Sequence, residues 1–106
     1  MDQGELNKDQ QDQLLFMMLI QQHQQIGMMG LGKLMNPATN EMEKDLASAK
    51  YAIDTLTVIG KYTDGNLPKE LKSYLDQTLT TLRLNYADEA KKGGSEEKAA
   101  ESDPEN

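Results

Sequence analysis

Few side chains in this sequence can do chemistry, and their spacing does not assemble a reactive group. His23 is the single histidine, and no acidic residue lies within one helical turn of it, whereas a zinc site usually needs about four ligands. Ser48 and Ser73 have no general base at a matching level of the chain, and cysteine is absent. We therefore expect no catalytic residue and no metal ligand, and interpret His23 as a structural hydrogen-bonding residue in a polar layer.

The carboxylates are equally weak candidates. Asp54 could be a catalytic carboxylate, but the carboxylate expected to face it, Asp76, lies on a helical surface without an evident cleft. Asp64-x-Asn66 resembles the start of a calcium loop, but Pro68 takes the next ligand position and the required glycine is missing. We expect Asp54 to be a structural polar residue and expect no bound cofactor.

Helical periodicity is clearest between Asn40 and Thr63. Asn40 and Glu43 have the spacing of a capping box, and Gly65 suits the end of a helix. The stretch therefore predicts a helix over residues 40–63. Its apolar or small residues recur at 4-3-4-3-4 spacing, which forms one continuous stripe along such a helix: Met42, Leu46, Ala49, Ile53, Leu56 and Gly60.

Two further helices are expected on either side. The first begins between residues 8 and 13 and ends at Met35, because Pro37 excludes Asn36 from helical geometry. The third begins at Pro68, with Asn66 as its cap, and continues to about residue 86. No segment alternates with the period of a strand. The sequence therefore predicts an all-α three-helix bundle, with the long first helix followed by two helices in antiparallel hairpins.

Charge divides the chain into three parts. The formal net charge of −7 is the sum of −3 in residues 1–13, 0 in residues 14–87 and −4 in residues 88–106. We expect a polar acidic N-terminal segment (1–13) that is partly frayed, a three-helix domain (14–87) and a disordered acidic tail (88–106). Without a positive stripe, neither nucleic acid nor an anionic membrane is an expected partner. With no cysteine and no basic leader segment, the expected location is the cytoplasm.

The first helix has more apolar surface than its own bundle can cover. Seven apolar residues follow one another from Leu14 to Ile20, and two neighbouring helices cover only about half of a helix circumference. Glycines at 27, 30 and 32 favour the close approach of another helix, with a break in the helix as the alternative. We therefore expect self-association, with a homodimer as first choice. The candidate interface residues are Leu14, Leu15, Phe16, Met18, Leu19, Gly27 and Gly30.

Arg83 is the only arginine, and counting residues from the turns places it about seven residues out of step with Asp54, roughly 10 Å. We therefore expect Arg83 to bind the free carbonyls at the end of the first helix, or the Asn36-Pro37 turn, as a structural polar residue. Its five donors in a fixed fork suit that role better than a lysine does.

Five short motifs occur in order along residues 14–87: Leu31-Gly32, Asn36-Pro37-x-Thr39, Leu46-x-x-Ala49-Lys50-x-x-Ile53-Asp54-x-Leu56, Lys61-x-Thr63-x-Gly65-Asn66-Leu67 and Leu79-x-x-Leu82-Arg83-x-x-Tyr86. Together they resemble an uncharacterised bacterial family, domain of unknown function 1844. The sequence departs from that family at three turn positions, where glycine is expected in place of Asn40, a basic residue in place of Asp64, and threonine or serine in place of Pro68. The resemblance supports the fold and brings no activity, substrate or catalytic residue.

Three functions are compatible with these features. The first is a non-enzymatic, self-associating protein-interaction module, an adaptor or small regulatory subunit. The second is a chaperone-like groove that captures peptides, which the methionine pairs at 17–18 and 28–29 would suit. The third is a small ligand-binding or enzyme-accessory bundle. Its polar pocket would use Gln22, His23, Gln25, Asp54 and Gln77. The surplus of apolar surface on the first helix favours the first function.

Overall fold

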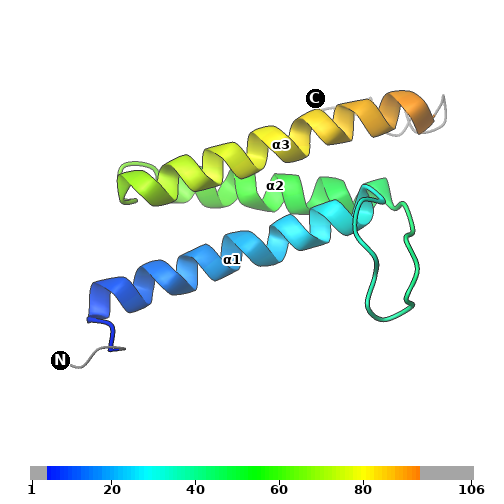
Figure 1. Cartoon of the computed structure of the whole chain (residues 1–106). Coiled ribbons are helices and arrows are strands. Elements are labelled where there is room, and N and C mark those ends of the chain that lie inside the picture. The colour runs from blue at the N-terminus through cyan, green and yellow to red at the C-terminus, as the bar shows by residue number, and fades with distance from the viewer. Residues whose placement is uncertain (1–4, 94–106) are drawn as a thin grey trace.

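The computed structural model describes residues 5–93 and consists of three helices, α1 (Lys8–Gly30), α2 (Leu46–Thr63) and α3 (Lys69–Gly93) (Figure 1). α2 returns antiparallel to α1, and α3 runs back in the direction of α1. The predicted all-α three-helix arrangement is confirmed, and no strand occurs within residues 5–93.

α1 starts inside the segment that the charge pattern predicts to be partly frayed. Asn7 caps the helix through a reciprocal capping box: the Gln10 backbone N–H donates to Asn7 Oδ1 at 2.8 Å, and the Asn7 backbone N–H donates to Gln10 Oε1 at 3.0 Å. α1 therefore begins at Lys8, within the expected range of residues 8 to 13, and residues 8–13 form its first turns. Residues 1–4 lie outside the described part of the chain.

α1 also ends earlier than the proline predicts, at Gly30 instead of Met35. Gly32 takes a left-handed φ of 77°, the Lys33 N–H donates to the Met28 carbonyl at 2.9 Å, and the Gly32 N–H donates to the Met29 carbonyl at 3.0 Å. This pair of bonds is a Schellman motif, which satisfies the last carbonyls of the helix. A glycine at the C′ position thus ends the helix before Pro37 is reached.

α2 begins at Leu46, so the predicted capping box at Asn40 is wrong. Asp45 is the cap, and it accepts hydrogen bonds from the backbone N–H of Ser48 at 3.3 Å and from the Ser48 hydroxyl at 2.9 Å. Asn40 has a φ of 61° in a turn where the Asn36 N–H donates to the Glu41 carbonyl at 2.9 Å. Glycine adopts this left-handed conformation without strain, which agrees with the glycine that the resemblance leads us to expect at this position.

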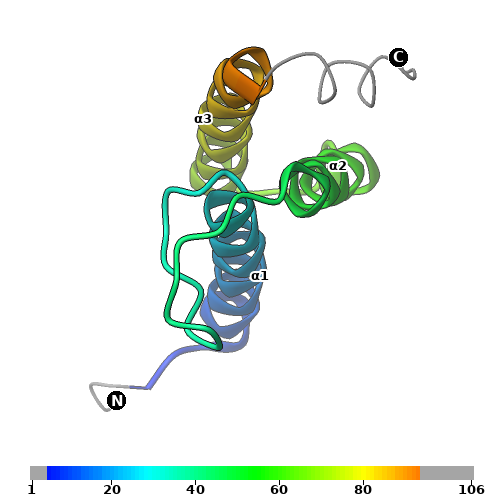
Figure 2. The ribbon, with the colours of Figure 1, turned by 90° about the vertical axis from the view of Figure 1, so that its right-hand side faces the viewer.

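Residues 31–45 thus form a long interhelical loop between α1 and α2. Figure 2, which looks along the helices from the loop end, shows the loop on the side of α1 away from α2, extending away from α3. Figure 1 shows the same loop hanging below the C-terminal end of α1. The loop therefore borders the side of α1 that neither α2 nor α3 covers.

The core lies between the three helices. α2 contributes most of the stripe predicted from its sequence, although Met42 is 57% exposed because its segment belongs to the loop. α3 contributes leucines at one-turn intervals, and α1 contributes few large buried side chains. The buried apolar residues are Ile20, Leu31, Leu46, Ala49, Ala52, Ile53, Leu56, Leu71, Leu75, Leu79 and Leu82.

α3 continues to Gly93, past the boundary at Asp88 where the sequence predicts disorder. Glu89 explains the extension, because its side chain is only 6% exposed and bonds to lysines of the interhelical loop. The predicted disordered tail is therefore wrong for residues 88–93. The remainder, residues 94–106, lies outside the described residues.

Candidate functional site

The outward side of α1 carries a regular row of residues that are exposed, except for the last, Met29, which is half-buried and lines a depression with Asn36 and Glu43 of the interhelical loop. An α-helix turns about 100° per residue, so residues spaced by 4-3-4-3-4 share one narrow strip. Counted this way, the strip lies opposite Ile20, which is completely buried. We call it the outer seam. It consists of Gln11, Leu15, Met18, Gln22, Gln25 and Met29.

Exposed apolar side chains make up the N-terminal half of the outer seam and its flanks. On the seam, Leu15 is 64% and Met18 is 44% exposed, and beside it Leu14 is 46% and Leu19 is 36% exposed. Four of the predicted interface residues are therefore exposed on the surface of α1.

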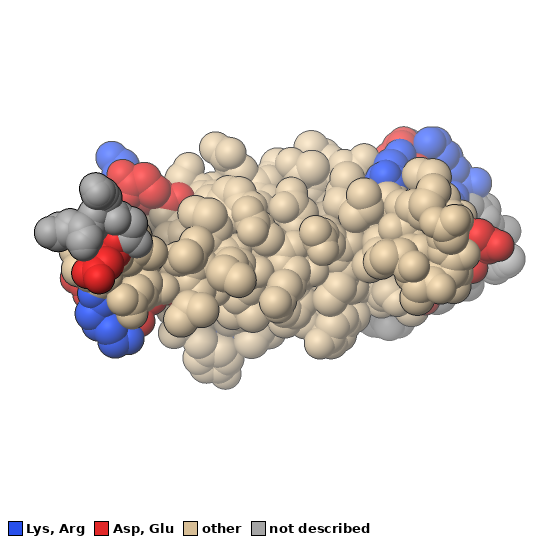
Figure 3. All heavy atoms as spheres, turned by 60° about the horizontal axis from the view of Figure 1, so that its bottom comes forward, with Lys and Arg blue, Asp and Glu red and all other residues tan. Residues whose placement is uncertain are grey.

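No charged side chain interrupts this surface. From Gln13 to Gly32 the sequence contains no aspartate, glutamate, lysine or arginine. Figure 3 views the molecule from the side on which α1 lies: lysine, arginine and acidic side chains gather at the two ends, and the middle is uncharged. A surface of this kind favours burial against another uncharged surface. No helix within residues 5–93 combines the length and the apolar character that crossing a membrane requires.

The glycines face the interior of the same chain, so Gly27 and Gly30 are wrong as interface residues. A Cβ at Gly30 would lie 2.7 Å from the Ala49 nitrogen and 2.7 Å from the Asp45 carbonyl oxygen. The Asp45 N–H donates to the Gly30 carbonyl at 2.7 Å, which joins the end of α1 to the start of α2. The glycines therefore permit a close approach between helices, as expected, but within one subunit.

Phe16 is also wrong as an interface residue, because it is half-buried and packs against the core cluster. The reason is geometric. Phe16 lies one turn before Ile20 on the inward side of α1, whereas Leu15 follows the outer seam. An apolar run alone cannot distinguish these two sides. Which residues of the run are exposed depends on where the neighbouring helices pack, and only the fold shows this.

The predicted polar pocket does not form. The His23 Nδ1 atom donates to the Leu19 carbonyl of its own helix at 3.0 Å, and the His23 ring lies 6.2 Å from that of Tyr51, measured between centroids. Asp54 lies on the surface of α2, paired with Lys50 at 2.8 Å. The other members do not join them, since Gln22 and Gln25 are exposed on the outer seam and Gln77 lies on the surface of α3. His23 and Asp54 thus make separate contacts, each within its own helix, and share no layer.

Arg83 does not reach the end of α1 or the Asn36-Pro37 turn, and that prediction is wrong. Its guanidinium Nη2 donates to the Thr57 hydroxyl at 2.7 Å, and that hydroxyl donates to the Ile53 carbonyl at 2.8 Å. Arg83 therefore joins α3 to the middle of α2. Counting residues from the turns failed because α3 is shifted along α2 relative to the assumed level.

The most strongly perturbed titratable group is Glu89, which the sequence analysis overlooked. Lys44 lies 2.8 Å and Lys33 lies 3.0 Å from its carboxylate, at the two ends of the interhelical loop, and Lys92 lies 3.4 Å away. The hydrogen bonds from Lys44, then Lys33, lower the pKa of Glu89 from 4.5 to about 2 against the opposing effect of burial. The bond to Glu89 in turn raises the pKa of Lys92. We call these four residues the Glu89 cluster. Its ion pairs connect the interhelical loop to α3.

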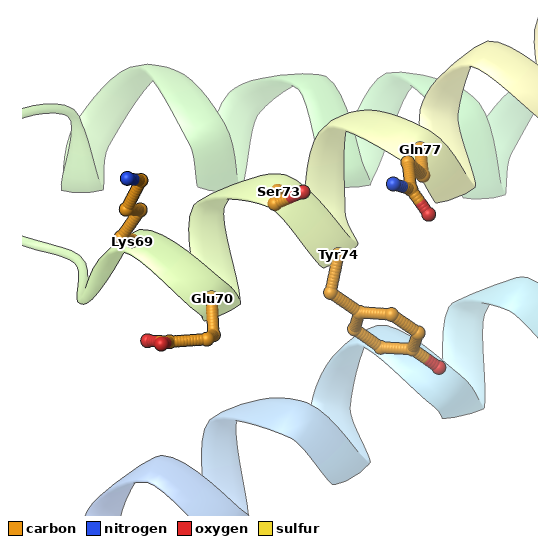
Figure 4. A pocket seen from close by; sticks show the side chains of 5 residues that line it. All are labelled: Lys69, Glu70, Ser73, Tyr74 and Gln77. Carbon is orange, nitrogen blue, oxygen red and sulfur yellow. The ribbon is translucent and has the colours of Figure 1, made fainter.

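A shallow depression on α3 is lined by Lys69, Glu70, Ser73, Tyr74 and Gln77 (Figure 4). In this view the Tyr74 ring points toward α1, and Ser73 lies on the outer side of α3. No side-chain hydrogen bond links Ser73 to Lys69 or Gln77 in the described part of the chain, so no activated nucleophile is assembled there. Likewise, no three metal-ligating side chains within residues 5–93 come together around a common point.

Comparison with known proteins identifies a family and no function. A family model described as "Domain of unknown function (DUF1844)" matches residues 13–88. No curated protein and no solved structure matches the chain. The matched residues contain the outer seam of α1 from Leu15 onward, all of α2 and most of α3 including Arg83.

Proposed function

The chain belongs to the DUF1844 family, and we propose that it is a non-enzymatic helical interaction module that associates with a second copy of itself through the outer seam of α1. The observation that carries the proposal is the exposed, uncharged row centred on Leu15 and Met18. A role as an adaptor or small regulatory subunit follows from this surface. The bacterial cytoplasm remains the expected setting, since a chain without cysteine does not depend on disulfides.

Energetics support association. Fully burying a leucine or methionine side chain contributes about 1.5–3 kcal/mol, and the half-exposed side chains of the seam gain a part of this. Leu14, Leu15, Met18 and Leu19 on each of two copies supply enough apolar surface to offset the entropy lost on association. A small bundle gains more from such a partner than a large domain does, because its own core is small.

Two of the three glutamines of the seam, Gln22 and Gln25, support an ordered pairing over a loose one. Each amide of Gln22 and Gln25 both donates and accepts hydrogen bonds, so a second copy can satisfy what it buries. Buried amides fix register and oligomeric state in helical pairs. A random apolar peptide offers no matching side-chain amides, which places the peptide-capturing groove second.

The mass of the full-length chain in solution tests this function. Sedimentation at low micromolar concentration should give a species of about twice 11.9 kDa. The substitution Met18→Glu places a charge in the seam of each copy and should return the protein to the mass of one subunit. If the unsubstituted chain sediments as a single subunit, the proposed self-association is wrong and the peptide-capturing groove becomes the better explanation of the exposed seam.

A further inference from the structure

The interhelical loop itself carries a second set of exposed apolar side chains, near the outer seam. Leu34 is 40%, Met35 is 48% and Met42 is 57% exposed. The loop lies beyond the C-terminal end of α1 on its uncovered side (Figures 1 and 2). At the opposite end of α1, Leu14 and Leu15 are exposed without a loop beside them. The exposed apolar residues of the loop thus lie beside the C-terminal end of α1. The N-terminal end of α1 has exposed apolar residues but no loop beside them.

We propose that two copies pair antiparallel along α1, so that the interhelical loop of each copy covers the N-terminal half of α1 in the other. This inference rests on the proposed self-association and specifies its geometry. The surface is then a composite of the outer seam and the loop residues Leu34, Met35 and Met42. Its occupant is a second copy of the same chain.

The register of the pairing follows from matching the seam to itself. In an antiparallel pair, facing residue numbers add to a constant, and a constant of 47 places Gln22 opposite Gln25 and Met18 opposite Met29. Amides then meet amides at the centre and apolar side chains meet apolar side chains outside them. Leu15 falls opposite Gly32, where the partner's loop begins. A constant of 40 would instead put Leu15 against Gln25, burying an amide beside an apolar side chain without a partner.

Helix dipoles disfavour the parallel alternative. A parallel pair in register also matches like with like along the seam. However, it aligns the two helix dipoles, whereas an antiparallel pair opposes them. In addition, a parallel pair leaves both N-terminal halves of α1 without the loop that the antiparallel pair supplies.

The absence of cysteine gives a clean test by disulfide crosslinking. Antiparallel pairing places residue 18 of one copy opposite residue 29 of the other. It separates residue 18 from its own equivalent by 11 positions, roughly 16 Å along the axis. A disulfide requires Cα atoms within about 7 Å. An oxidised mixture of full-length Met18→Cys and Met29→Cys chains should therefore yield mostly the mixed disulfide, and neither variant alone should crosslink.

The outcomes separate this inference from the proposed function. Crosslinking of Met18→Cys with itself would show parallel pairing and overturn the inference while leaving self-association intact. A dimer by sedimentation that forms no mixed disulfide would overturn the register. A Ser73→Cys chain, altered on the outer side of α3, is the matched control and should not crosslink in any arm.

Discussion

The Glu89 cluster and the outer seam of α1 differ in whether their side chains have partners within the same chain. At the cluster, one buried carboxylate is matched by Lys33, Lys44 and Lys92, so the charges are satisfied within the chain. Along the outer seam, Leu15 and Met18 are exposed and no charged residue accompanies them. The Glu89 cluster therefore connects parts of a single subunit to one another. The outer seam presents a surface that a single copy of the fold does not cover.

Because of this difference, substitutions in one region should affect the stability of the subunit, and substitutions in the other should affect its association. Substitutions where α1, the loop and α3 meet should change the free energy of unfolding of each subunit, because every group there has an internal partner. Substitutions on the outer seam should leave the subunit folded and change only the mass of the assembly. Among the substitutions that act on folding, the expected effect decreases from Gly30 through Glu89 to Arg83.

The largest effect on folding is expected at Gly30. The substitution Gly30→Ala places a Cβ 2.7 Å from backbone atoms of Asp45 and Ala49, which cannot move independently of α2. We expect the free energy of unfolding to fall by about 2 kcal/mol, despite the better helix propensity of alanine. Thermal unfolding followed by circular dichroism measures the change.

Gly27→Ala is the matched control for Gly30→Ala. Its added Cβ would lie 2.9 Å from Leu82 Cδ2, the far end of a flexible side chain that can rotate away. Alanine also gains about 1 kcal/mol of helix propensity, so we expect a change of less than about 1 kcal/mol. If the two alanine variants were equally stable, the close crossing at Gly30 would not limit the fold.

The second effect is pH-dependent and belongs to Glu89. Its pKa falls from 4.5 to about 2 on folding, so ionised Glu89 stabilises the folded state above pH 4.5 and loses that contribution as the pH falls towards 2. Glu89→Gln should therefore lower the melting temperature at pH 7. The difference from the unsubstituted chain should narrow progressively below pH 4.5.

Melting curves of both chains between pH 7 and pH 2 provide the test. The Glu89→Gln substitution keeps the shape of the side chain but removes its charge, so the pH profile isolates the ion pairs with Lys33 and Lys44. A constant difference in melting temperature across this range would mean that packing, and not charge, is what Glu89 contributes.

The smallest effect is expected at Arg83, which is exposed and donates to the Thr57 hydroxyl. Because the Arg83 guanidinium makes a single, solvent-exposed hydrogen bond, Arg83→Lys should change the free energy of unfolding by no more than about 0.5 kcal/mol. Urea unfolding of the two chains measures this. A loss above about 1 kcal/mol would show that the fork geometry of the guanidinium matters.

Sequence reasoning recovered the helices and their order, because hydrophobic periodicity and turn residues report directly on them. The helix ends were less predictable. Two left-handed positions, Gly32 and Asn40, moved the end of α1 to Gly30 and the start of α2 to Leu46. Gly32 was visible in the sequence, but Pro37 was given more weight. A glycine just past an apolar run was the signal that could have placed this helix end.

The site was only partly predictable for a related reason. The surplus of apolar residues on α1 could be counted, and the exposed leucines and Met18 were named correctly as surface residues. The inward positions of Phe16 and Gly27 depend on where α2 and α3 lie, which periodicity does not reveal. Glu89 was missed because its partners Lys33 and Lys44 are distant in sequence and adjacent only in the fold.

Two matched leucine substitutions test the central claim most directly. Leu15 on the outer seam is 64% exposed and Leu84 on α3 is 68% exposed, so glutamate should be equally tolerated by the folded subunit at either position. Sedimentation of the two variants and the unsubstituted chain at one concentration compares their association. We predict that Leu15→Glu gives single subunits and that Leu84→Glu stays dimeric. Dimers of equal stability from both variants would contradict the role of the outer seam.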